Sequence, residues 1–150
     1  MKKYNPLFPE SANNEYNGYK VAKYVFLGII VMTVIRSCIH VFAPDGGAGT
    51  IARFDTSGPQ GQNLISIFAQ WGLMQLIVVF IFIIVYIRYQ SLISFCWLLI
   101  FFEYTGRVLV GLSKPAILPQ APPGALLILL IPISIVMLYF SLKIPKNKRL

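Results

Sequence analysis

Residues 92–112 read LISFCWLLIFFEYTGRVLVGL, a mostly apolar run that contains two charged side chains, Glu103 and Arg107. A transmembrane α-helix needs about 20 such residues to cross a hydrocarbon layer of about 30 Å. Glu103 and Arg107 are four positions apart, so they share one face of the predicted helix and can form an ion pair. Ionised groups at membrane depth are costly and usually face a protein interior, where they often mark a functional site.

Three more apolar runs of similar length lie at residues 24–42, 64–87 and 125–142. Hydrophobic residues make up 57% of the 150-residue chain and charged residues 12%, whereas a soluble domain carries roughly 25% charged residues. The sequence therefore predicts an all-α integral membrane protein. Its four-helix bundle spans residues 24–142, between an N-terminal cytoplasmic or interfacial segment at 1–23 and a basic tail at 143–150.

Basic residues are distributed unequally between the two sides of this predicted bundle. Nine cations lie beside the termini and in the short link between the second and third runs, namely Lys2, Lys3, Lys20, Lys23, Arg88, Lys143, Lys146, Lys148 and Arg149. On the other side, Arg53 and Lys114 are balanced by Asp45 and Asp55. Because cationic loops stay in the cytoplasm, we expect both termini to be cytoplasmic. The net charge of +8 is thus a topology signal and does not indicate nucleic-acid binding.

Helical spacing groups the polar residues of the spans into faces. Thr33, Arg36, Ser37 and His40 form one stripe on the first span. The second span contributes Gln70 from one side and Gln75 from another. Arg36, Gln70, Glu103 and Arg107 all lie roughly 8–14 Å below the predicted outer surface, at 1.5 Å per residue. We therefore expect Arg36, Glu103 and Arg107 to converge in the outer half of the bundle.

Three packing features are also expected from the sequence. The link at residues 88–91 is short enough to hold the second and third spans as an antiparallel hairpin. Gly106 and Gly111 offer small surfaces at which helices can approach closely. Pro132 lies inside the fourth span, where it is expected to kink the helix.

The sequence offers no recognisable metal or redox unit. It has one histidine and two cysteines, Cys38 and Cys96, without a CxxC motif. The two cysteines belong to opposite ends of their predicted spans, too far apart for a disulfide. We therefore predict no metal and no cofactor.

The four short spans, the polar start of the second span, the segment FEYTGRVLVGL at 102–112 and the proline-rich loop before the fourth span resemble small bacterial DoxX-like membrane proteins. This resemblance covers roughly residues 24–142. It implies a compact four-helix bundle in the bacterial inner membrane, but a fold does not fix a function.

Several interpretations of the buried charges remain open. Glu103 between Arg36 and Arg107 would form a well-satisfied network that fixes helix register. Alternatively, the excess of positive charge favours an outward-facing pocket for an amphiphilic or anionic ligand, such as a lipid headgroup, with Arg36, His40, Gln70, Glu103 and Arg107 as ligand-binding residues. A third interpretation is an interface with a copy of the chain or with a larger membrane complex, in which the protein is an accessory subunit. A membrane enzyme of lipid or quinone-linked chemistry would require Glu103 and His40 to meet; the absence of a nucleophile–base pair favours binding or assembly over catalysis.

The charge distribution yields a prediction about topology. In a variant without Cys38 and Cys96, a cysteine at Ser57 is expected to react with a membrane-impermeant maleimide from outside the cell, and one at Asn147 only after permeabilisation. Labelling of Asn147→Cys in intact cells would contradict the predicted orientation.

Overall fold

The computed structural model describes residues 6–118 and 120–145, and over these residues it contains helices and no strands. The helices are α1 (Lys20–Phe42), α2 (Pro59–Arg88), η1 (Gln90–Leu92), α3 (Ile93–Ser113), η2 (Pro123–Leu129) and α4 (Leu130–Leu142), where η denotes a 3₁₀-helix. Four helical segments within the described residues are long and apolar enough to cross a membrane: α1, α2, η1 with α3, and η2 with α4. This confirms the four predicted helices. Lys2, Lys3, Lys146, Lys148 and Arg149 lie outside the described residues.

The first two helices begin before the apolar runs from which they were predicted. The first begins at Lys20 instead of residue 24, and the second at Pro59 instead of residue 64. Hydropathy marks only the part of a helix that suits hydrocarbon, whereas backbone hydrogen bonds continue into the flanking polar residues. Pro59 suits its position because the N–H of a first-turn residue has no partner within the helix.

The fourth span is wound in two ways. Residues Pro123–Leu129 form η2, and the α-helix begins only at Leu130. Pro132 therefore lies in the first turn of α4, where its missing N–H removes no helical hydrogen bond. The change from 3₁₀ to α winding thus lies two residues before Pro132, and the kink at Pro132 stays a prediction.

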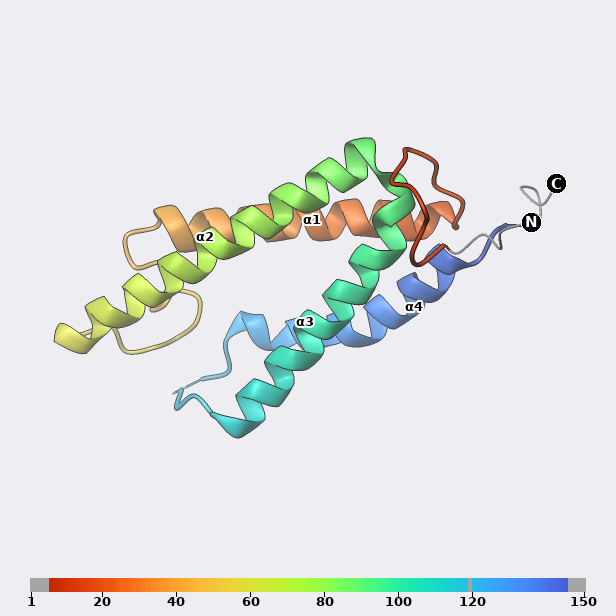
Figure 1. Cartoon of the computed structure of the whole chain (residues 1–150). Coiled ribbons are helices and arrows are strands. Elements are labelled where there is room, and N and C mark those ends of the chain that lie inside the picture. Colours follow the sequence, from red (N-terminus) through yellow and green to blue (C-terminus); the bar gives the residue numbers. More distant parts are fainter. Residues whose placement is uncertain (1–5, 119, 146–150) are drawn as a thin grey trace.

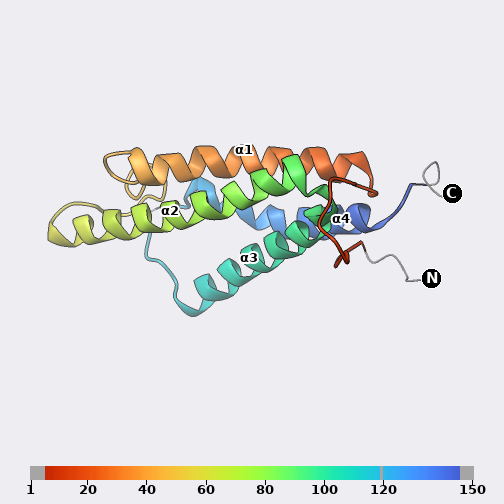
Figure 2. The ribbon, with the colours of Figure 1, turned by 45° about the horizontal axis from the view of Figure 1, so that its top comes forward.

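The helices are arranged as two pairs (Figures 1 and 2). Helix α1 packs along α2, and α3 packs along α4. The start of α1, the turn between α2 and α3, and the end of α4 lie together at one end of the molecule, called here the terminus end. At the opposite end, called the loop end, α1 ends, α2 begins, α3 ends and η2 begins.

Aromatic packing near the terminus end joins the two pairs. The Phe26 ring lies 5.3 Å from the Phe82 ring and 5.9 Å from the Trp97 ring, measured between centroids. The Trp97 indole Nε1–H donates to the Ala22 carbonyl at 3.2 Å. Phe26 and Trp97 are fully buried, so this contact fixes the start of α3 against α1.

The predicted α2–α3 hairpin was wrong in one respect. The connection is short, but α2 and α3 separate as they leave it and have few contacts (Figure 1). The first half of α3 is held elsewhere, by the bond from Trp97 to α1 and by a bond from Ser94 Oγ to the Ser141 carbonyl at 3.2 Å. These anchors direct α3 away from α2, so the two helices diverge toward the loop end (Figure 1).

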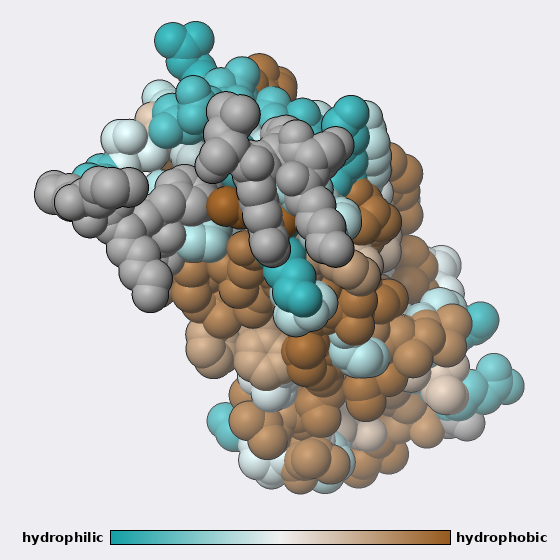
Figure 3. All heavy atoms as spheres, turned by 90° about the vertical axis from the view of Figure 1, so that its right-hand side faces the viewer, coloured by the Kyte–Doolittle hydropathy of each residue, from teal (hydrophilic) through white to brown (hydrophobic). Residues whose placement is uncertain are grey.

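Much of the outer surface is hydrophobic. Large apolar side chains on all four α-helices are exposed, including Val31, Phe80, Leu109 and Val136. Seen from the terminus end, hydrophilic residues gather toward the top, and hydrophobic residues cover much of the remaining described surface (Figure 3). Such extensive apolar exposure is unsuited to water and fits the span-capable helices.

Helices α1 and α2 approach each other closely at Gly72. A Cβ atom built on Gly72 would lie 2.5 Å from the His40 Cβ atom and 3.2 Å from the Ser37 carbonyl oxygen. In contrast, Cβ atoms at Gly106 and Gly111 would meet nothing within 4 Å. The expectation that these two glycines mediate helix packing was therefore wrong, because they face away from neighbouring helices.

This packing predicts that Gly72→Ala lowers the free energy of unfolding by about 1–3 kcal/mol, the usual effect of overpacking. The matched control is Gly28→Ala in α1, where a Cβ atom would meet nothing within 4 Å. Melting curves in mild detergent measure both. Equal Tm values for the two variants would argue against the close α1–α2 contact.

Candidate functional site

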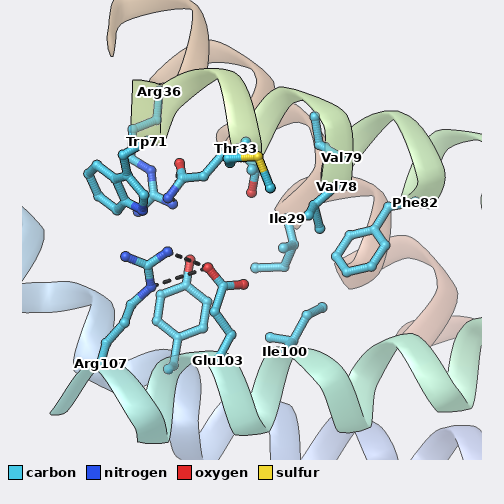
Figure 4. A pocket seen from close by; sticks show the side chains of 13 residues that line it. Ile29, Thr33, Arg36, Trp71, Val78, Val79, Phe82, Ile100, Glu103 and Arg107 are labelled. Atoms are coloured by element: carbon cyan, nitrogen blue, oxygen red, sulfur yellow. Dashed lines mark hydrogen bonds and ion pairs between the residues drawn. The ribbon is translucent and has the colours of Figure 1, made fainter. Parts of the chain in front are cut away.

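A cavity of about 190 Å³, called here the inner cavity, lies between the helix pairs. It is bounded by α1, α2 and α3. Polar side chains gather at one end of it and apolar side chains at the other (Figure 4). The apolar end is lined by Ile29, Val78, Val79, Phe82 and Ile100, and the polar end by Thr33, Arg36, Trp71, Gln75, Glu103, Tyr104 and Arg107.

Glu103 and Arg107 form the ion pair predicted from their spacing. The Arg107 Nε and Nη2 atoms both donate to Glu103 Oε1, the former at 3.2 Å. About one third of each side chain is exposed, 32% for Arg107 and 37% for Glu103, because both reach into the cavity. The pair neutralises Arg107 locally and keeps both groups on the cavity wall.

Trp71 of α2 brings the two arginines together. The Arg107 guanidinium carbon lies 4.7 Å from the centre of the Trp71 ring, and the Arg36 guanidinium carbon lies 5.7 Å from it. A tryptophan face attracts cations through its quadrupole, with an effect of about 0.5–2 kcal/mol. Arg36 and Arg107 therefore lie beside one indole ring, and Glu103, which pairs with Arg107, lines the same cavity.

Arg36 is held by a neutral partner. Its Nη2 atom donates to Gln75 Oε1 at 3.1 Å, and Ser37 Oγ donates to the same oxygen at 3.3 Å. Among the described residues, the Arg36 Nε and Gln75 Nε2 atoms are buried and have no hydrogen-bond partner. Gln75 is only 6% exposed. Two buried donors on adjacent side chains thus lack a partner among the described residues, and both side chains line the polar end of the cavity.

His40, predicted as a ligand-binding residue, does not line the inner cavity. Its Nδ1 atom lies 2.7 Å from the Gly46 carbonyl oxygen, and its ring packs 4.9 Å from Trp71 and 5.6 Å from Phe68. His40 is buried at the end of α1. These contacts join α1 to the following loop and to α2. His40 lines a separate cavity.

Gln70 also lies away from the inner cavity. It is exposed on α2, and its Nε2 atom donates to Ser66 Oγ at 3.2 Å. Gln75 occupies the place that the sequence analysis gave to Gln70. Its position four residues after Trp71, on the same helical face, is the signal that identifies it.

A second, larger cavity of about 480 Å³, called here the outer cavity, lies toward the loop end. Arg36, Trp71, Tyr104 and Arg107 line both cavities and separate them. The rest of its lining is mostly apolar and comes from the loops and helix ends, including His40, Ile51, Phe68, Val108 and Ile128.

The loop after α1 supplies part of the wall of the outer cavity. Asp45 accepts hydrogen bonds from the backbone N–H groups of Thr50 at 2.7 Å and Gly47 at 2.9 Å. These bonds hold the pKa of Asp45 below its usual value. Gly46 and Gly47 adopt positive φ angles of 57° and 69°, a conformation that glycine tolerates readily. The resulting compact loop positions Ile51 beside the outer cavity.

The arrangement does not assemble the residues required by the enzymatic alternative. Glu103 lines the inner cavity and His40 the outer one. In residues 6–118 and 120–145, no three His, Cys, Asp or Glu side chains lie close enough to hold a metal ion. Cys38 and Cys96 are both free thiols.

Comparisons with protein-family models, with curated proteins and with solved structures found no match. The resemblance to DoxX-like proteins therefore stays a prediction.

The ion pair gives a prediction about stability. Glu103→Ala is expected to destabilise the protein by about 1.5 kcal/mol, the lower end for a bond to a charged group, because both partners are partly exposed. The double variant Glu103→Ala with Arg107→Ala is expected to be more stable than the single variant, since an unpaired charge at membrane depth is the costly state. Melting curves in detergent decide the order, with the loop variant Asp55→Ala as control. A double variant that melts below the single variant would contradict it.

Proposed function

We propose that this protein is an integral protein of the bacterial inner membrane that binds an amphiphilic anionic ligand in the inner cavity. The ligand's charged headgroup lies against Arg36, Gln75 and Arg107, and its apolar chain extends along the other end of the cavity. The observation that carries this proposal is the pair of buried, unpartnered donors, Arg36 Nε and Gln75 Nε2, beside an apolar chamber.

The proposed orientation places both termini in the cytoplasm and the loop end outside. The unequal distribution of basic residues supports it, because nine cations lie on the side of the termini while the other loops are balanced. The polar end of the inner cavity then lies in the outer half of the membrane. A ligand held there would have its headgroup nearer the outer surface than its chain.

The chemistry of the cavity lining supports an amphiphile over a purely polar anion. Ile29, Val79 and Phe82 offer only apolar surface, which accommodates an alkyl chain but would bury a polar group without a hydrogen-bond partner. Guanidinium and amide N–H groups favour an oxyanion, since charge-assisted hydrogen bonds are roughly twice as strong as neutral ones. The two properties meet in one cavity, as they do in a lipid with an acidic headgroup.

The test is native mass spectrometry of the full chain in mild detergent, mixed in turn with phosphatidylglycerol and with oleate. We expect one bound molecule of at least one of them, and about tenfold weaker binding in Arg36→Ala, equivalent to about 1.4 kcal/mol. The matched control is Arg53→Ala, which removes an exposed cation from the loop after α1. It should bind like the wild type.

Two results would contradict the proposal. Binding of both probes that is unchanged in Arg36→Ala would place the lipid elsewhere on the protein. A stoichiometric partner protein that is lost in Arg36→Ala, with no lipid bound, would favour the accessory-subunit interpretation.

A further inference from the structure

The inner cavity has a definite charge. Among the described residues that line it, the charged groups are the guanidiniums of Arg36 and Arg107 and the carboxylate of Glu103. Two positive groups and one negative group leave a net charge of +1. The other polar lining residues, Thr33, Gln75 and Tyr104, are neutral in their ordinary states.

The three charges are not shared equally. Glu103 accepts two hydrogen bonds from Arg107 through a single oxygen, Oε1. Arg36 donates to the neutral amide oxygen of Gln75 instead. The positive charge without a carboxylate partner therefore lies on Arg36, on the same side chain as one of the two unpartnered donors.

From this charge balance we infer that the ligand is a single-charged amphiphile, a monoanion, and that Glu103 excludes dianions. The inference rests on the proposed function and names the class of its ligand. One negative charge beside Arg36 neutralises the cavity, with Arg36 Nε and Gln75 Nε2 as donors to the oxyanion. A second negative charge has no cation left, because Arg107 is already paired, and it would face the Glu103 carboxylate.

The same balance disfavours zwitterionic lipids. A choline or ethanolamine group attached to the bound phosphate would bring a cation to a wall that already carries two guanidiniums. Like charges in a region of low dielectric repel by several kcal/mol at short range. The matching chemistry is a carboxylate or a phosphodiester without a compensating cation, so both a fatty acid and phosphatidylglycerol satisfy it.

The experiment is a competition in native mass spectrometry at pH 8, with the full chain in mild detergent. Equal amounts of phosphatidylglycerol, phosphatidic acid and phosphatidylcholine compete for the protein. Phosphatidic acid is mostly a dianion at this pH, since the second pKa of a phosphomonoester is about 6. Wild-type protein is expected to retain phosphatidylglycerol about tenfold over each of the other two. A separate arm replaces phosphatidylglycerol by oleate, and comparison of the two arms identifies whether the phosphodiester or the carboxylate binds better.

Charge variants then test the role of Glu103. Glu103→Gln raises the net charge of the cavity to +2 while keeping the shape of the side chain. It is expected to shift the ratio about tenfold toward phosphatidic acid. The double variant Glu103→Gln with Arg107→Gln restores a net charge of +1, so its preference should return to the monoanion. Asp55→Asn, which removes an exposed loop carboxylate, is the matched control and should leave the ratio unchanged.

The outcomes separate the two proposals. A wild-type protein that retains phosphatidic acid as well as or better than both monoanions, or a ratio that Glu103→Gln does not change, would overturn the charge inference alone. Failure of every lipid to bind in an Arg36-dependent way would instead overturn the proposed function. If Glu103→Gln does not fold, the wild-type ratio and the double variant still decide, because both carry the same predicted preference.

Discussion

The packing of Trp97 against α1 determines the shape of this protein. Its indole fills the space beside Phe26 and donates to the Ala22 carbonyl, so the start of α3 cannot move away from α1. Association between membrane helices depends on such packing and interhelical hydrogen bonds, because burial of apolar side chains gains little when lipid is the alternative. With one end of the two helix pairs fixed, the other end is free to open. The inner cavity is the consequence of that opening.

The opening creates the environment in which three charged groups can be tolerated. Each would be costly against lipid chains, but Arg107 is paired with Glu103, and both arginines lie on the face of Trp71. Gln75 accepts from Arg36 and so extends the polar wall onto α2. A tighter bundle would have no room for these groups. The divergence of α3 therefore makes room for the polar residues in its second half.

Sequence patterns were sufficient to predict the helices and the position of Arg36, Glu103 and Arg107 at one site. Apolar runs of spanning length and the four-residue spacing of the ion pair depend on local geometry, which is readable along the chain. Which side of α2 faces the cavity depends on how α2 is rotated against α1, and Gly72 sets this through its contact with His40. The spacing of Gln75 from Trp71 identifies Gln75 over Gln70 only once Trp71 is known to face the cavity, and that depends on this rotation. The divergence of α2 and α3 was hidden for a similar reason, because it follows from bonds to α1 and α4 that are distant in sequence.

The position of Glu103 distinguishes a structural network from a binding site. A network that only fixes helix register is most stable when its one carboxylate bridges both guanidiniums, since buried donors without partners weaken the fold. Here the carboxylate serves Arg107, while Arg36 Nε and Gln75 Nε2 keep their hydrogens unpaired within the described residues. Both residues line the cavity. An oxyanion placed there would accept hydrogen bonds from the donors that Glu103 does not reach. Unpaired donors at Arg36 and Gln75 weaken the fold, but they would strengthen the binding of an anion. Their presence therefore favours binding over a purely structural role.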